Sequence, residues 1–570
     1  MEPPSWRTSS GDRLRAFSRQ RHNQLALAAV TGALTGLAVA AFDWVVAQHL
    51  LDDLYRAPVA VQVAAPAAGL VLAALALRLL AGGASPATSD EYIHNFHEPG
   101  VRLDLRPVLG RIVAAAATLG LGGAMGFEGP SIYLGAALGT GLQARFRRWF
   151  DPLDAKVLMV AGAAAGVSAI FKTPATGAIF AIEVPFQDDT AKRMLFPALV
   201  ASASGYLVFV AFNGTTPLFP ISGSPPFGLR ELAGAAALGL LAGCGARVFA
   251  AAVRWAKAWQ QRMHPVVSVG LGGASLAGLM VVSRAVYGQS LTLGSGYNVI
   301  AWIAQGHHAL WAIALLLVLR AVATPATVGG GGAGGLFIPL VVLGALVGAA
   351  CGAAVHEPTV TLFPVIGVAA FLGAGYRTPL AAVMFVAEST GRPGFIVPGV
   401  IAAVVSQLVM GRQSISIYQG TPRRGHLEGR LALPLTAAVQ GDTPTVPSEL
   451  TLDEVVDGHL LATRHTSVAV VDGARFVGML SLTDLADTPR PDWSTTRVAD
   501  VVAPDPPRAQ VGWSIEDAVR LMDEADTDVL AVVDPQDRFV GLVTTADLVR
   551  LDQILGTAEG LDRPAGEDRP

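Results

Sequence analysis

A glycine-rich segment with a central proline occurs twice in this chain, at residues 122–139 and again at 331–348. The two copies are offset by 209 residues and are identical at nine of eighteen positions. Only the first copy carries an acidic residue, Glu128. A second pair of segments, 171–183 and 376–388, matches at an offset of 205. The chain is therefore built from two related halves.

The repeats lie in a strongly apolar part of the sequence, which indicates a membrane protein. The chain is 52% hydrophobic and 15% charged, with a mean hydropathy of +0.49, too apolar for a soluble globular protein of this size. In many membrane transport proteins, repeated halves meet near the bilayer midplane, where broken helices point their amides at a substrate. Ten apolar runs are long enough to cross or enter the ~30 Å hydrocarbon core: 25–46, 59–80, 108–142, 157–170, 195–212, 232–252, 266–282, 310–322, 336–354 and 395–410.

Charge is distributed unevenly along the chain. Residues 440–570 hold 25 of the 44 acids and 10 of the 40 bases, so this part is net −15 and the remainder is net +11. An acidic soluble part argues against nucleic-acid binding, because phosphate would repel it. Five arginines before the first apolar run predict a cytoplasmic N-terminus in the plasma (inner) membrane: Arg7, Arg13, Arg15, Arg19 and Arg21.

The composition predicts five parts in chain order. Residues 1–21 form a basic cytoplasmic arm, and residues 22–419 form the transmembrane domain, with repeats at roughly 22–212 and 228–419. A polar linker follows at 420–436, then a soluble α/β region at 437–556 and an acidic disordered tail at 557–570. Two cysteines in apolar runs exclude a disulfide framework and a cysteine metal site.

The soluble region is itself repeated, which indicates two similar small domains. Each copy reads as strand, turn, strand and helix start, and each contains Gly-x-x-Ser/Thr-x-x-Asp. This arrangement resembles a cytoplasmic pair of CBS domains, a family that often binds adenosyl ligands at this motif. The resemblance implies that Asp484 and Asp547 bond a ribose and that Ser481 and Thr544 face phosphate. The alternative is that these residues simply cap helices.

The first glycine-rich copy predicts a helix N-terminus inside the membrane. Glycines at 126 and 129 permit unusual backbone conformations, and Pro130 suits the first turn of a helix. Free amides and the positive end of the helix dipole form an anion site that needs no lysine or arginine. Glu128 lies where the anion would bind, so it can compete with the ion, swing aside or carry a proton. The alternative is a capping acid at an interfacial helix start.

The second copy has the same geometry without the acid, so its amides are free for the anion itself. Tyr418 follows the last apolar run and is placed to turn a hydroxyl toward the same anion. The alternative for this tyrosine is an anchor at the membrane interface.

These motifs together resemble the CLC family of chloride channels and anion/proton exchangers. The marks are Gly-x-Glu-Gly-Pro at 126–130, Gly-x-Phe-x-Pro at 335–339 and Ser-Ile-Tyr at 416–418. The resemblance covers residues 22–419 and implies inverted-topology repeats, a homodimer and one anion pathway per subunit. It also implies gating by Glu128 and anion binding around Phe127, Gly129, Leu336, Phe337 and Tyr418.

The sequence departs from the family pattern at three places. Pro86 stands where many members have an anion-binding serine, with Thr88 or Ser89 as substitutes. Phe127 replaces a common arginine before the glutamate, which weakens attraction at the outer mouth. Val184 stands where many exchangers carry a second acid that relays protons, and valine cannot take a proton.

The sequence leaves two transport functions open. Val184 favours a passive chloride channel gated by Glu128, and the alternative is an anion/proton antiporter, with Glu183 or water relaying the proton and with a possible preference for another anion. No enzyme activity is expected. An intramembrane metalloprotease would need His-Glu-x-x-His, and both His-Glu pairs lack the second histidine. A cation pathway would need clustered carboxylates, whereas the membrane helices show helix-start motifs instead. No cofactor is required for transport, apart from a possible adenine nucleotide at the CBS pair.

Overall fold

A computed structural model of the protein describes residues 10–98, 103–147, 156–187, 189–219, 228–357, 359–420, 431, 433–439, 443–460, 467–481, 484–502 and 506–551. Side chains are described from residue 22 onward, except at 460, 467 and 487. The predicted tail at 557–570 lies outside the described residues, as do most of the predicted linker and the side chains of the predicted N-terminal arm. The chain divides into two compact units, Met1–Pro422 and Arg423–Pro570.

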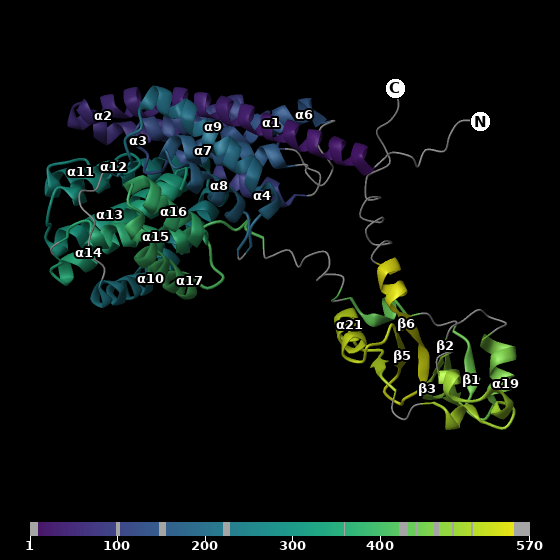
Figure 1. Ribbon diagram of the computed structural model, residues 1–570. Helices are drawn as coiled ribbons and strands as arrows, with labels where there is room; N and C mark the ends of the chain where they lie inside the picture. The colour runs from purple at the N-terminus through teal and green to yellow at the C-terminus, as the bar shows by residue number, and fades with distance from the viewer. Residues whose placement is uncertain are drawn as a thin grey trace, which may run out of the picture. The chain divides into compact units, whose positions relative to one another are not determined.

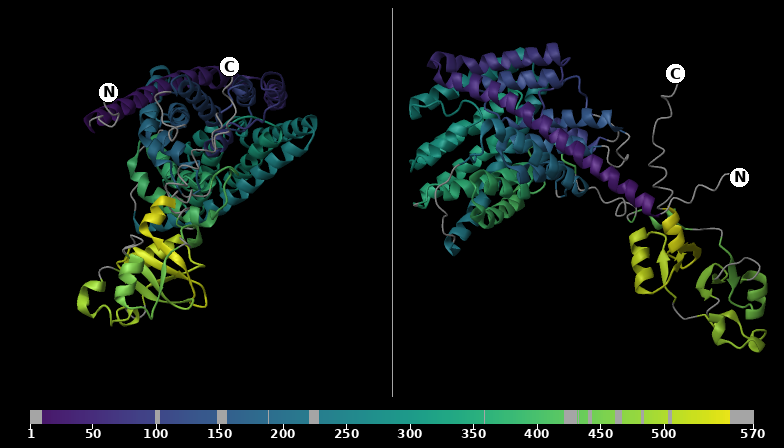
Figure 2. Two further views of the ribbon diagram at one scale, coloured as in Figure 1. Left: turned by 90° about the vertical axis from the view of Figure 1, so that its right-hand side faces the viewer. Right: turned by 45° about the horizontal axis from the view of Figure 1, so that its top comes forward.

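The described residues of the first unit form helices and the loops that join them, and the two halves contain similar helices in the same order (Figures 1 and 2). The first half comprises α1 (Ser10–Val45), continued by a π-helix (Val46–Leu51) and α2 (Asp52–Arg56), then α3 (Val59–Leu80), α4 (Ser89–His97), α5 (Val108–Gly120), α6 (Glu128–Arg145), α7 (Val157–Phe171), α8 (Pro174–Glu183) and α9 (Leu195–Asn213). The second half comprises α10 (Leu229–Arg262), α11 (Pro265–Tyr287), α12 (Tyr297–Ala304), α13 (Leu310–Gly329), α14 (Phe337–Ala354), α15 (Leu362–Tyr376), α16 (Pro379–Thr390) and α17 (Ile396–Met410).

Eight helices in the described part of the chain are long and apolar enough to cross a membrane, and shorter apolar helices lie between them. The apolar run predicted at 108–142 is two helices, because the glycine-rich segment breaks it after Gly120. Residues 362–376 and 379–390 were not among the predicted runs, yet they form α15 and α16. Each of these two helices is too short to cross the bilayer alone.

Each half contains a broken helix pair, formed by α7 with α8 and by α15 with α16. Lys172 and Arg377 end the first helix of each pair in the left-handed conformation, with φ of 56°. A Thr-Pro dipeptide then starts the second helix, and its proline occupies the first turn. The same local sequence therefore produces the same break twice.

The two halves contact each other through matching side chains. The amide of Ala124 donates to Oγ1 of Thr327 on α13, and the amide of Ala333 donates to Oγ1 of Thr118 on α5, both at 3.1 Å. Each threonine thus holds the glycine-rich segment of the other half. This reciprocity indicates that the repeats are related by an approximate twofold axis.

Close backbone contact between neighbouring helices accounts for many glycines. A Cβ atom at Gly135 of α6 would lie 2.1 Å from the carbonyl oxygen of Gly162 on α7. In the other half, a Cβ atom at Gly344 of α14 would lie 2.4 Å from the carbonyl oxygen of Gly367 on α15. Small residues at such crossings let membrane helices pack without a side-chain layer between them.

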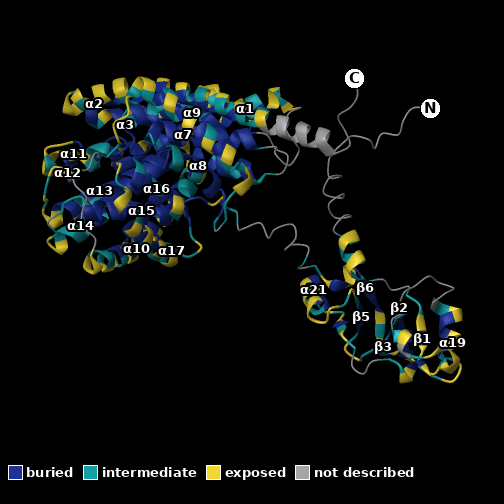
Figure 3. Cartoon of the chain, in the orientation of Figure 1, coloured by how far each residue is buried: buried dark blue, intermediate teal, exposed yellow. Residues whose placement is uncertain are grey.

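Buried residues fill the centre of the helical unit, and exposed residues lie on its outer helices (Figure 3). Many of the exposed side chains are large and apolar, including Leu79, Val248 and Leu408. An aqueous surface rarely carries so much apolar area, whereas a bilayer accepts it. The first unit is therefore a multi-pass membrane domain.

The second unit contains two matching three-stranded sheets. The first sheet has β1 (Thr445–Pro447) parallel to β2 (Ser467–Asp472), and β2 antiparallel to β3 (Arg475–Ser481). The second repeats this order with β4 (Arg508–Gln510), β5 (Val529–Val533) and β6 (Phe539–Thr544). Short helices α19 (Leu452–Val455) and α21 (Ile515–Glu524) accompany the sheets. An apolar cluster that includes Phe476 and Leu542 draws on both sheets.

Candidate anion site

The two glycine-rich segments meet backbone to backbone in the middle of the helical unit. Gly126 and Gly335 form an antiparallel pair, with N–H···O distances of 2.8 and 2.7 Å. Helices α6 and α14 begin two residues after this pair, so their N-termini lie side by side. A Cβ at Gly129 would lie 2.5 Å from Oγ1 of Thr88, the residue that precedes α4. Three helix N-termini therefore converge, and their dipoles favour an anion between them.

The carboxylate of Glu128 occupies this meeting point. Its side chain is fully buried, and Oε1 accepts a hydrogen bond of 2.5 Å from the backbone N–H of Phe337. The amides of Glu128 itself and of Ile338 also face the carboxylate, whereas Oε2 accepts no hydrogen bond of normal geometry within the described residues. A Cβ at Gly126 or Gly335 would lie within about 2 Å of a carboxylate oxygen. The glycines leave the room that the carboxylate fills.

A cavity of about 290 Å³ opens next to this site. Gly334 and Leu336 line one part of it, and Arg254 and Lys257 of α10 line another. The ammonium group of Lys257 pairs with Asp90 at the start of α4. The cavity, hereafter the vestibule, thus combines backbone next to the start of α14 with basic side chains, which suits a small anion.

The predicted site residues fall into two groups. Phe127 caps α6 and is buried against the edge of Phe42, with ring centroids 6.4 Å apart. Gly129 lies in the first turn of α6, and Phe337 begins α14. The remaining residues line the vestibule: Pro86, Thr88, Ser89, Leu336 and Tyr418.

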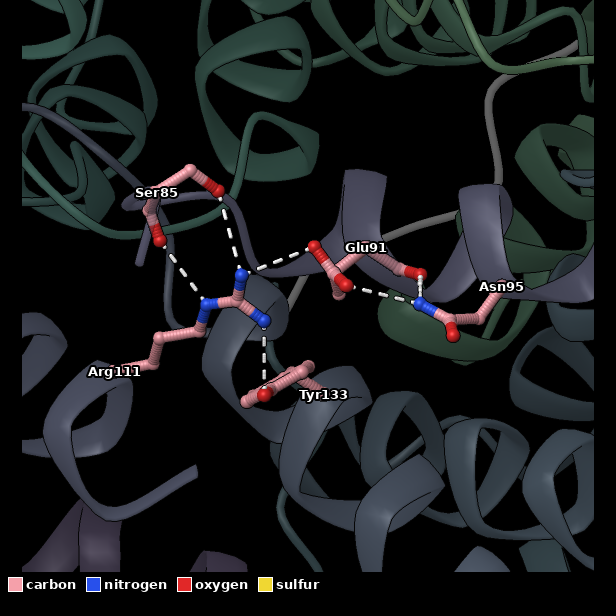
Figure 4. A network of polar contacts seen from close by, with 5 residues as sticks. All are labelled: Ser85, Glu91, Asn95, Arg111 and Tyr133. Atoms are coloured by element: carbon pink, nitrogen blue, oxygen red, sulfur yellow. Dashed lines mark hydrogen bonds and ion pairs between the residues drawn. The ribbon is translucent and has the colours of Figure 1, made fainter. Parts of the chain in front are cut away.

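A buried arginine holds the loop that departs from the family pattern (Figure 4). Nε of Arg111 donates to the carbonyl oxygen of Ser85 at 3.0 Å, and another guanidinium nitrogen donates to the hydroxyl of Tyr133 at 2.9 Å. A third contact joins Arg111 to Glu91 at 3.1 Å, and Glu91 in turn accepts from Asn95. These bonds fix residues 85–91 beside the vestibule. This network was not predicted, because its members are scattered along the chain between residues 85 and 133.

Of the three residues at the departure, Pro86, Thr88 and Ser89, only the last two carry a polar side chain. Oγ1 of Thr88 donates to the carbonyl oxygen of Gly334 at 2.9 Å, and Ser89 begins α4. Pro86 has no side-chain donor and contributes only its surface to the vestibule.

Val184 lies at the end of α8 and is buried. Next to it, the carboxylate of Glu183 accepts from the amides of Leu380 and Ala381 at 3.1 and 2.9 Å, at the start of α16. The repeat mate Glu388 accepts from the amides of Ala175 and Thr176 at the start of α8. Each carboxylate therefore caps the broken helix of the other half.

The two tyrosines near the vestibule differ in exposure. Tyr418 is 38% exposed, and its ring lies 4.8 Å from that of His94. Tyr376, at the end of α15, is 1% exposed, and its ring packs edge-on against that of Phe180, with centroids 5.5 Å apart. Tyr376 was not among the predicted site residues. Its position as the first residue of the second repeated motif was the available signal.

The candidate nucleotide residues lie at helix starts in the soluble unit. The carboxylate of Asp484 accepts from the amide and hydroxyl of Ser481, both at 2.7 Å. Asp547 makes the same pair of bonds with Thr544, at 2.9 and 2.6 Å. The capping alternative thus describes this geometry, and ribose binding stays a prediction.

Fold and site together define a multi-pass membrane transporter for small anions. The family profile described as "Voltage gated chloride channel" matches residues 68–411, more than half of the chain, and the CBS domain profile matches 439–489 and 498–553. The protein belongs to the CLC family and carries a C-terminal CBS pair. It is an anion transporter of that family and not an enzyme.

Several relatives and solved structures resemble the chain. The H(+)/Cl(-) exchange transporter ClcA of Salmonella paratyphi A is 28% identical over 432 residues, covering 70% of this chain and 88% of that protein. ClcA of Salmonella typhimurium is 29% identical with the same coverage. A slow cyanobacterial Cl−/H+ antiporter matches with a TM-score of 0.60 at 21% identity, covering 68% of this chain and 94% of that chain. A eukaryotic CLC transporter matches with a TM-score of 0.58 at 17% identity and covers 93% and 98%.

Proposed function

We propose that the protein exchanges a small anion, chloride in the first instance, for protons, with Glu128 as both gate and proton carrier. The carrying observation is the bond between Oε1 of Glu128 and the amide of Phe337. That amide is one of the donors that an anion at the start of α14 would use. Carboxylate and anion therefore compete for one position.

Protonation of Glu128 decides this competition. Backbone amides bind the charged carboxylate, and the side chain is fully buried from solvent. Once protonated, it loses its attraction for the helix start and leaves the Phe337 amide to the incoming anion. The movement of the Glu128 side chain thus links binding of a proton to binding of an anion at the Phe337 amide. This link is the basis of proton–anion coupling.

The relatives named as H(+)/Cl(-) exchange transporters support exchange over passive conduction. In this scheme Glu183 replaces the acid that is missing at Val184. Its carboxylate lies at the wall of a cavity of about 370 Å³ that is also lined by Asp189 and Lys192. A carboxylate that reaches such a polar cavity can take a proton there and pass it inward through water.

The second candidate is a passive chloride channel on the same scaffold, and Val184 favours it. A buried valine at the end of α8 offers no proton site at that position. If Glu183 serves only as the cap of α16, protons do not follow the anion.

The proposal extends to the assembly and to the tail. It includes a homodimer in the inner membrane with the N-terminus and the CBS pair on the cytoplasmic side, in line with the arginines that precede the first apolar run. It also includes adenine nucleotide binding at Asp484 and Asp547. Millimolar ATP then raises the unfolding temperature of the CBS pair. An unchanged unfolding temperature would mean that Asp484 and Asp547 only cap helices.

The exchange proposal is tested in liposomes loaded with chloride. Chloride efflux and external pH are recorded together, with a potassium ionophore to dissipate voltage. Exchange predicts uphill proton movement driven by the chloride gradient, and Glu128→Gln, which mimics the protonated acid, keeps chloride flux and loses proton movement. Chloride efflux without proton movement in the unmodified protein would instead establish the channel.

A further inference from the structure

Two acidic residues in the first turn of α4 each pair with a basic residue, and the two pairs differ in their surroundings. Glu91 pairs with Arg111, whose side chain is 6% exposed and has further partners in a buried network (Figure 4). Asp90 pairs with Lys257 of α10, whose side chain is 27% exposed, and both residues line the vestibule. The first pair is therefore part of a fixed network, and the second is open to the anion's cavity.

One face of α10 borders the vestibule. Arg254, Lys257 and Gln261 line the cavity, and they lie three and four residues apart on the helix. Charged side chains inside a membrane domain usually face water or an ion pathway. The vestibule also reaches Leu336, which directly precedes the Phe337 amide of the anion site. An anion that enters the site through the vestibule therefore meets this face of α10.

The two basic side chains on this face differ in what holds them. The guanidinium group of Arg254 donates to the carbonyl oxygen of Ser414 and, at 3.2 Å, to Oε1 of Gln413, so it fixes the segment after α17. The ammonium group of Lys257 instead pairs with the carboxylate of Asp90. An ion pair that is partly exposed is weak, and the flexible lysine stem lets the ammonium group turn. A chloride ion in the vestibule can therefore replace the carboxylate at Lys257.

We propose that Lys257 is an anion-binding residue of the vestibule, and that the carboxylate of Asp90 competes with the transported anion for its ammonium group. The inference rests on the proposed anion transport and adds a second place where a carboxylate and the anion exchange. Loss of the ammonium group weakens anion binding. Loss of the Asp90 charge frees the ammonium group and strengthens anion binding. If the pair only joined α4 to α10, breaking it from either side would weaken binding.

The test compares Lys257→Met with Asp90→Asn in the purified full-length protein. Chloride binding is measured by isothermal titration calorimetry in sodium gluconate at about 0.1 M ionic strength, where charges more than about 10 Å apart are largely screened. Loss of a partly exposed ion contact predicts about fivefold weaker chloride binding for Lys257→Met. Asp90→Asn should bind chloride about twofold or more tightly than the unmodified protein.

The matched control is Arg247→Met, which removes a positive charge from the same helix about 15 Å away along its axis. Arg247 is exposed, donates to the carbonyl oxygen of Val409 and is not among the described residues that line the vestibule. Chloride affinity in this variant should stay within about twofold of the unmodified protein. A loss equal to that of Lys257→Met would reduce the effect to overall charge and overturn the inference.

The direction of the two changes decides the inference. Unchanged binding in Lys257→Met, or unchanged or weaker binding in Asp90→Asn, overturns it. Should Lys257→Met not give a monodisperse protein, Asp90→Asn decides alone by the same rule. If the unmodified protein binds no chloride and moves none in liposomes, the proposed function fails. If it binds chloride and Lys257→Met binds equally well, only the inference fails.

Discussion

The two halves of the membrane domain share a scaffold and differ in a few side chains at its centre. Thr118 and Thr327 make the same bond across the repeats, and Glu183 and Glu388 cap each other's broken helices. At the anion site the symmetry ends. Glu128 stands opposite Phe337, and the position of Tyr376 is Phe171 in the other half. The duplication therefore supplies the geometry, and the carboxylate of Glu128 supplies the asymmetry on which the proposed gating depends.

The largest expected effect comes from filling the space between the halves. In Gly335→Ala, the new Cβ would lie 2.0 Å from Oε1 of Glu128 and 2.5 Å from the amide of Gly129. The carboxylate can move aside but the Gly129 amide is backbone and cannot, so we expect about tenfold or greater loss of chloride flux in liposomes. The control is Gly278→Ala on α11, where an added Cβ meets nothing within 4 Å. Normal flux in Gly335→Ala would contradict the crowded geometry of the site.

Glu183 and Glu388 make matching helix caps, so substituting each one tests whether the two also have the same role in transport. Glu183→Gln and Glu388→Gln each weaken two amide bonds at a helix start, which we expect to cost about 1–3 kcal/mol and to lower the unfolding temperature of both variants similarly. Only Glu183→Gln should also reduce the proton-to-chloride ratio, because only Glu183 lines the polar cavity beside Asp189.

Two results would break this comparison between the caps. An equal loss of coupling in both variants would mean that the helix pair, and not the proton on Glu183, matters for exchange. A clear difference in unfolding temperature would mean that the repeats are less alike in packing than their bonds indicate.

The smallest expected effect concerns the two CBS domains. Hydrogen bonds from Thr451 lower the pKa of Glu454, and those from Ser514 lower the pKa of Asp517. A carboxyl with a lowered folded-state pKa stabilises the fold above its unfolded pKa, and this contribution is lost as the pH falls through the folded pKa. Amide hydrogen exchange should therefore show α19 of the first CBS domain and α21 of the second opening more readily below about pH 4, and to a similar extent. If amide hydrogen exchange were insensitive to pH in only one of the two CBS domains, the two domains would not be stabilised in the same way.

Sequence alone predicted the scaffold well, because its causes are local. Gly and Pro at fixed spacing determine where α6 and α14 begin. The Thr-Pro dipeptides lie in the repeated segments 171–183 and 376–388, although no break was predicted there. The site was harder, since its contacts join distant segments. The bond from Phe337 to Glu128 spans 209 residues, and the Arg111 network depends on loops that pack only in three dimensions.

The central claim is that the carboxylate of Glu128 holds the place of the transported anion at the amide of Phe337. The most direct measurement is anomalous diffraction from bromide-soaked crystals of the unmodified protein and of Glu128→Ala. The account predicts a bromide peak within hydrogen-bonding distance of Phe337 N in Glu128→Ala that is missing from the unmodified protein at neutral pH. A peak at that amide beside an unmoved Glu128 carboxylate, or no peak there in either crystal, would contradict it.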